Sequence, residues 1–129
     1  MVEIILYVAD QNRSRNFYAQ VLQKEPSLDV PGMTEFELNE TCKLGLMPEN
    51  GIAKILGDHL PHPASGNGIP RCELYLFMED PAETCELALS FGGKKISEVA
   101  PRNWGHTVGS VSDPDGHVLA FAKHTSGNF

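Results

Sequence analysis

An internal repeat is the strongest constraint on the fold of this 129-residue chain. Residues 2–9 form a near-continuous apolar run, which is typical of a buried strand, and Asp10 follows where a helix N-cap belongs. Residues 72–79 are strand-like again, and Asp80 opens a second helix signature of the Asp-Pro-x-Glu kind. An offset of 70 residues therefore lays the start of one half on the start of the other.

Both halves continue with strands joined by short turns. Polar residues at Asn39–Glu40 and at Asp113–Gly116 separate apolar runs, a pattern that predicts hairpins. An offset of 74 aligns these turns and matches Leu46 with Ala120. The predicted order is βαβββ over residues 1–48, a linker over 49–71, and βαβββ again over 72–129, an α+β single domain of two modules.

Composition excludes several partners. The net charge of −7 leaves no basic footprint for nucleic acid, and no apolar run reaches the length of a membrane span. The three cysteines show no CxxC spacing, which favours reduced residues of a cytoplasmic protein. If the negative charge is concentrated in a cleft, it favours cationic ligands.

Three motifs give the chain a family resemblance. They are the strand and Asp10 followed by a helix that ends Phe17–Leu22, the turn Asp113–His117 before the last strand, and Trp104–Gly105 before the penultimate strand. In this order and spacing they resemble the vicinal oxygen chelate superfamily, which includes glyoxalase I, extradiol dioxygenases, fosfomycin-resistance enzymes and bleomycin-resistance proteins. Gln23 departs from the pattern, because the family usually has glycine after this helix.

The resemblance implies a homodimer in which paired βαβββ modules curve their sheets into a cup. In the family the cup often holds a divalent metal bound by up to four side chains. Counting along the motifs places those positions at Glu3, Leu46, Glu73 and Ala120. Two carboxylates satisfy neither a catalytic zinc site, with its three protein ligands, nor a non-haem iron site. We therefore expect no metal and no other cofactor, with a divalent metal as the alternative.

Strand alternation then predicts the lining of the cup, because every second residue of a strand shares a face. Trp104 joins the lining as a platform for stacking or as a plug in the sheet. The predicted ligand-binding residues are Glu3, Ile5, Tyr7, Leu44, Leu46, Glu73, Tyr75, Phe77, Trp104, Ala120 and Ala122. An apolar, aromatic hollow with two acids suits a planar or cationic small molecule. The plainer interpretation is that the aromatic residues fill the cup as core and the acids are solvated or paired.

Three functions remain open at this point. The first is a small-molecule-binding protein that sequesters an aromatic or cationic ligand without a complete metal site, as the bleomycin-resistance branch does. The second is a metal-dependent glyoxalase- or dioxygenase-type enzyme in which Glu3 and Glu73 hold the metal or one of them acts as a general base. The third is a structural or regulatory module. His117, in the turn before the last strand, is expected to be solvated, and the linker could serve as a lid.

Overall fold

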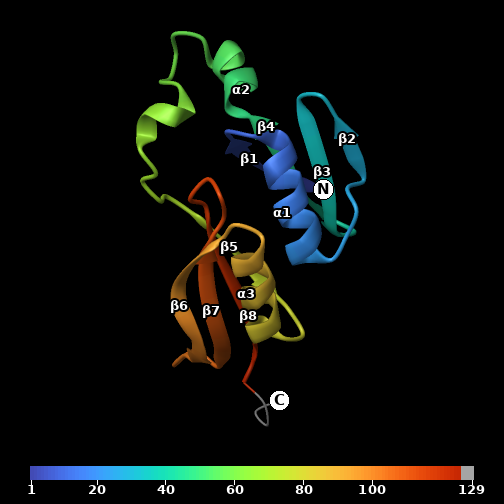
Figure 1. Ribbon diagram of the computed structural model, residues 1–129, viewed down its shortest axis with the longest axis vertical. Coiled ribbons are helices and arrows are strands. Elements are labelled where there is room, and N and C mark those ends of the chain that lie inside the picture. Colours follow the sequence, from blue (N-terminus) through green and yellow to red (C-terminus); the bar gives the residue numbers. More distant parts are fainter. Residues whose placement is uncertain (126–129) are drawn as a thin grey trace. The chain divides into compact units, whose positions relative to one another are not determined.

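The computed structural model describes residues 1–125 and divides into two compact units, Met1–Ile69 and the part that begins at Pro70 (Figure 1). Each unit contains a four-stranded mixed sheet and a helix on one face of it. The first unit contains β1 (Val2–Val8), α1 (Gln11–Leu22), β2 (Leu28–Val30), β3 (Met33–Asn39), β4 (Cys42–Pro48), α2 (Glu49–Leu56) and the 3₁₀ helix η1 (Pro63–Gly66). The second contains β5 (Glu73–Phe77), α3 (Pro81–Ser90), β6 (Lys94–Pro101), β7 (His106–Ser112) and β8 (Val118–His124).

The first sheet has the order β1-β4-β3-β2, in which β1 runs parallel to β4 and the other pairs are antiparallel. Helix α1 begins where the Asp10 side chain accepts the N–H of Arg13, at 3.0 Å. It lies against the face that carries Thr34, whose hydroxyl oxygen accepts a hydrogen bond from Gln11 Nε2 at 2.9 Å. The core between helix and sheet consists of Leu6, Val8, Phe17, Tyr18, Val21, Phe36, Leu44 and Leu46.

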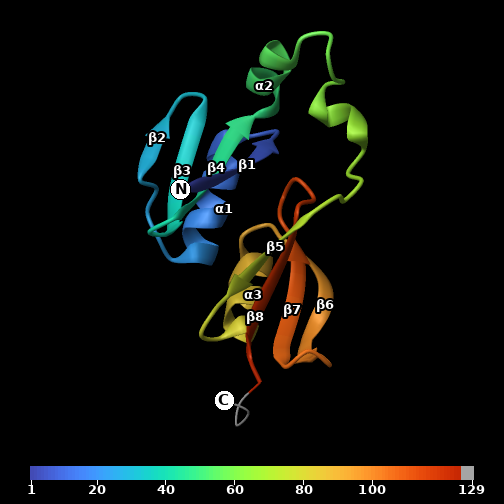
Figure 2. The same ribbon diagram turned by 180° about the vertical axis from the view of Figure 1, so that it is seen from behind.

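The second sheet repeats this plan with the order β5-β8-β7-β6, and Figure 2 shows β8, β7 and β6 side by side. Asp80 caps α3 by accepting the N–H of Glu83 at 3.1 Å, and Pro81 occupies the first helical turn. The helix-side core contains Leu74, Ala88, Val111, Leu119 and Phe121. The predicted α+β fold of two βαβββ modules is confirmed.

Two elements were not expected from the sequence. The short strand β2 is the first of the three strands after α1, and each of its residues is exposed. The segment interpreted as a linker begins with α2, whose Ile52 is buried at 8% exposure. Within residues 1–125 no helix is both long enough and apolar enough to cross a membrane.

The register of β4 corrects one part of the predicted cup lining. Leu44 pairs with Ile4 and Leu46 pairs with Leu6, so both leucines point to the α1 side and are fully buried there. They do not share a face with Glu3. The residue opposite Ile5 is Gly45.

The same register corrects the alignment of the two halves. Ile5 and Tyr75 are 70 residues apart, but their strand partners Gly45 and Ala120 are 75 apart rather than 74. The counterpart of Ala120 is therefore Gly45, not Leu46. The error of one residue arose because the two aligned turns differ in length. A shift of one residue along a strand moves every side chain to the opposite face of the sheet.

Candidate functional site

The open face of the second sheet, opposite α3, carries most of the predicted aromatic residues. Tyr75 pairs with Ala120 and Phe77 pairs with Ala122, so these four residues share one face, as alternation predicted. Glu73 lies on the same face at the start of β5, opposite Val118. The two alanines are buried and form a floor of small side chains.

Tyr75 lies across this floor. Its ring packs against Val108, Ala120 and Ala122, and its hydroxyl lies 2.8 Å from His106 Nδ1 on β7. Trp104, in the connection between β6 and β7, donates its indole N–H to the same hydroxyl at 3.0 Å. Tyr75 is therefore packed onto the sheet, and its two polar partners fix its orientation.

Phe77 and two histidines extend this group into a continuous cluster of rings. The Phe77 ring is 5.0 Å from the His106 ring in an edge-on arrangement and 5.3 Å from the His124 ring in a stacked one. Phe77 is 54% exposed and Trp104 is 57% exposed. We call Tyr75, Phe77, Trp104, His106 and His124 the ring cluster. Tyr75, Phe77 and Trp104 were among the ligand-binding residues predicted from the sequence. The two histidines were not, although their positions at the start of one strand and the end of another allowed either to reach the rim of the cup.

The open face of the first sheet carries acidic and aliphatic side chains together with the ring of Tyr7. Glu3, Ile5 and Tyr7 lie there as predicted, opposite Lys43, Gly45 and Met47. Glu35 of β3 pairs with Gly45 and so joins the same face, where it lies 3.6 Å from Lys43 Nζ. Glu35 was not among the residues predicted from the sequence. The alternation of β3 assigns it to this face only when the register of β3 with β4 is known.

Glu3 lies in an unusual environment for a carboxylate. One of its oxygens, Oε2, is buried without a hydrogen-bond partner and lies over Gly45, where a Cβ atom would come within 2.5 Å of it. Burial, a hydrogen bond with Glu35 and the negative charge of Glu35 raise the pKa of Glu3, while Lys43 lowers it. Glu3 therefore holds a proton more readily than an ordinary glutamate does.

The corrected register allows the four family metal positions to be compared with the residues present. They correspond to Glu3, Gly45, Glu73 and Ala120. Glycine and alanine have no side-chain donor, so these positions provide two carboxylates at most. This set does not fit a catalytic zinc or a non-haem iron.

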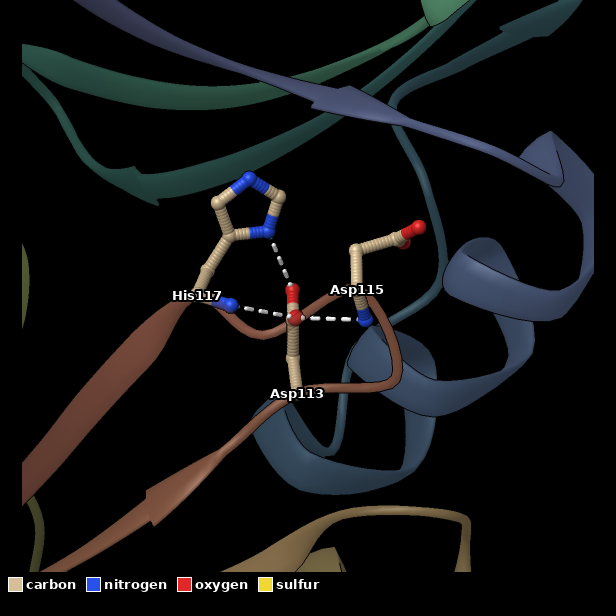
Figure 3. Close-up of side chains that lie close together, drawn as sticks. All are labelled: Asp113, Asp115 and His117. Carbon is tan, nitrogen blue, oxygen red and sulfur yellow. Dashed lines mark hydrogen bonds and ion pairs between the residues drawn. The ribbon is translucent and has the colours of Figure 1, made fainter. Parts of the chain in front are cut away.

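A third group of potential ligand atoms lies in the turn between β7 and β8. Asp113, Asp115 and His117 bring their ligand atoms within 4.8 Å of one another (Figure 3). Asp113 is 2% exposed and accepts the backbone N–H groups of Asp115 and His117, both at 2.9 Å. The sequence predicted a solvated His117. Its ring is instead held by Asp113, because His117 Nδ1 lies 2.8 Å from Asp113 Oδ2. These bonds make Asp113 the organising residue of the turn.

Comparisons with known proteins agree with this fold. Residues 1–124 match the family model of the glyoxalase-like domain. No significant match was found among curated protein sequences.

Solved structures with similar folds come from several bacteria. A glyoxalase-related enzyme from Fulvimarina pelagi is 21% identical, with a TM-score of 0.80 over 95% of this chain and 86% of that one. A glyoxalase/bleomycin resistance protein/dioxygenase family enzyme from Burkholderia phytofirmans PsJN is 12% identical, with a TM-score of 0.78 over 95% and 97%. A glyoxalase/bleomycin resistance protein from Albidiferax ferrireducens T118 is 16% identical, with a TM-score of 0.67 over 97% and 98%. At these identities the likeness concerns the fold alone. Together with the family match over nearly the whole chain, it shows that the chain belongs to the glyoxalase-like domain family, within the vicinal oxygen chelate superfamily.

Proposed function

We propose that this protein binds a planar aromatic small molecule, preferably a cationic one, on the open face of the second sheet, without a metal at the family positions. The observation that carries the proposal is the ring cluster. Phe77 and Trp104 are each more than half exposed, beside a floor of alanines. Exposed aromatic side chains grouped on one concave or flat face are the usual means of binding a planar ligand.

Charge supports the preference for a cation. Glu73 lies on the same face as Tyr75 and Phe77, and the whole chain carries a net charge of −7. A cation above an aromatic face gains about 0.5–2 kcal/mol, and a nearby carboxylate adds a salt-sensitive attraction. The donor-poor set Glu3, Gly45, Glu73 and Ala120 supports binding without metal chemistry at these positions.

The chain offers a direct probe, because Trp104 is its one tryptophan and belongs to the cluster. Titration with bleomycin and with proflavine, a planar aromatic cation, should change its fluorescence saturably. Phe77→Ala should weaken binding by about tenfold, since a stacked aromatic contact contributes on the order of 1 kcal/mol or more. Phe91→Ala is the matched control, because Phe91 is another exposed phenylalanine of the same unit, outside the ring cluster.

The electrostatic part has its own test. Glu73→Gln should weaken a cationic probe, and rising salt should reduce the difference between the variant and the parent protein. An affinity that neither the substitution nor salt changes would remove the preference for cations. The absence of a saturable response to any aromatic probe would overturn the proposal. The remaining candidates would then be an enzyme and a structural or regulatory module.

One observation favours an enzyme as the second candidate. A carboxyl group with a raised pKa is a stronger base when it is ionised, and burial together with the neighbouring Glu35 raises the pKa of Glu3. The reaction would be removal of a proton next to a carbonyl group. Incubation with a mixture of small carbonyl compounds in D₂O, followed by mass spectrometry, would detect exchange. Exchange that Glu3→Gln abolishes would support this candidate, and absence of exchange would argue against it.

We also propose that this protein resides in the cytoplasm, which is a reducing compartment. All three cysteines are free thiols, and Cys72 is exposed. An exposed thiol that stays unpaired is typical of cytoplasmic proteins.

A further inference from the structure

Two histidines of the ring cluster lie directly opposite each other at the ends of neighbouring strands. His106 of β7 pairs with His124 of β8 in the antiparallel register, so both side chains leave the sheet on its open face. Their ring centroids are 5.1 Å apart, and the ring planes are nearly perpendicular, at 81°. His124 is exposed and His106 is half-buried, so solvent reaches this end of the face.

This separation is compatible with a shared metal ion. A Zn–N bond of about 2.0–2.1 Å and a tetrahedral angle place the centroids of two bound imidazoles about 5 Å apart. Opposite positions on two antiparallel strands keep the Cβ atoms about 4.5–5.5 Å apart, so the backbone holds the pair at this spacing. Rotation of the His124 ring about its side-chain bonds is then enough to direct one of its nitrogens toward a point shared with a nitrogen of His106.

A neighbouring residue already holds one of the two rings. Tyr75 Oη lies 2.8 Å from His106 Nδ1, and Oη also accepts the indole N–H of Trp104. Metal-binding histidines almost always donate their second ring N–H to an oxygen acceptor, which fixes the ring and the tautomer. With Nδ1–H donated to Tyr75 Oη, the Nε2 atom of His106 is the ligating nitrogen.

We propose that His106 and His124 bind a borderline divalent transition ion, of the Zn²⁺ or Ni²⁺ class, at the edge of the open face. Imidazole nitrogen is a preferred ligand for these ions. The site uses none of the residues at the four family metal positions, and it does not depend on the binding of an aromatic ligand. Two protein ligands leave coordination positions for water or for a donor atom of a small molecule.

Trp104 reports on this site as well. Its Nε1 is 3.0 Å from Tyr75 Oη, which is 2.8 Å from His106 Nδ1, so a paramagnetic ion on the histidines would lie close enough to quench the indole. Titration of untagged protein with NiCl₂ at pH 7.5 should quench the fluorescence of Trp104 saturably. EDTA should reverse the quenching, and ZnCl₂ should compete with it without quenching.

Variants distinguish this pair from other histidines. His124→Ala leaves the hydrogen bond between Tyr75 and His106 intact and should weaken the apparent Ni²⁺ affinity by about tenfold or more, as loss of one of two ligands requires. His59→Ala in the segment after α2 is the matched control and should leave the affinity unchanged. His106→Ala should likewise weaken the apparent Ni²⁺ affinity by about tenfold or more. Circular dichroism checks that the sheet persists in this variant.

Two results would overturn the inference. The first is an absence of saturable, EDTA-reversible quenching in the parent protein. The second is quenching that persists at the same affinity in His124→Ala. The titrations with proflavine and bleomycin test the aromatic site independently of this metal site. Failure of the metal site can therefore be distinguished from failure of the aromatic site.

Discussion

Glu3 shows how far a single side chain can depart from its ordinary behaviour when its neighbours are fixed by strand register. Gly45 beneath it leaves space for the carboxyl group, Glu35 beside it adds a second negative charge, and Lys43 partly compensates. The raised pKa means that the folded state binds the Glu3 proton more tightly than the unfolded chain does. Its contribution to stability is therefore complete below the ordinary glutamate pKa and is lost as pH rises through the raised value.

Substitution of the two neighbours should move the Glu3 pKa in opposite directions. Glu35→Gln removes a negative charge and should lower it, whereas Lys43→Met removes a positive charge and should raise it. Carboxyl-carbon NMR titration of Glu3 in both variants measures the shifts. Unchanged pKa values of Glu3 in both variants would show that burial alone raises it.

Gln23 is the second residue with an unusual environment. It ends α1 with φ of 54° and ψ of 47°, in the left-handed region where glycine is preferred, and this is the position where the family usually has glycine. Gln23→Gly should raise the free energy of unfolding by about 0.5–1 kcal/mol, because a left-handed conformation costs other residues about that much. Urea unfolding measures the change. Gln20→Gly, inside the same helix, should instead lower stability by about 1 kcal/mol.

At the scale of elements, the two modules begin their helices with the same N-terminal capping interaction at equivalent positions. Asp10 and Asp80 each cap a helix by accepting the N–H three residues later. The hairpin between β7 and β8 also contains a buried carboxylate, Asp113, within its turn. This residue connects the backbone of the turn to the His117 ring.

Asp113→Ala should therefore destabilise the protein more than loss of a helix cap does. The substitution leaves two backbone N–H groups and the His117 ring without their acceptor, at a cost of about 2–3 kcal/mol. Asp80→Ala, which removes one exposed capping bond, should cost about 1 kcal/mol. Chemical unfolding of both variants tests the order. Equal losses would show that water replaces Asp113 in the turn.

At the scale of the whole molecule, exposed apolar side chains remain on both units. Val30 is 45% exposed, Ile69 72% and Ile96 54%. Exposed apolar surface is a common sign of an interface, and the family resemblance implies a homodimer. We expect light scattering coupled to gel filtration to give twice the chain mass of 14.1 kDa at micromolar concentration. A mass of one chain at all concentrations would contradict the expected homodimer.

The sequence by itself determined the βαβββ plan of the two modules and the helix starts at Asp10 and Asp80. It also determined the face that β1, β5 and β8 turn away from the helices. It did not locate β2 or α2. These follow from periodicity and capping, which are local properties of the chain. The tertiary structure decided the register of β4 against β1 and β3, and with it the exchange of Leu46 for Gly45 and the meeting of Glu3 with Glu35. It also brought His106 and His124 together beside Phe77. Strand register depends on pairing across turns of unequal length, and a shift of one residue exchanges the two faces of a strand, so no local pattern could specify it.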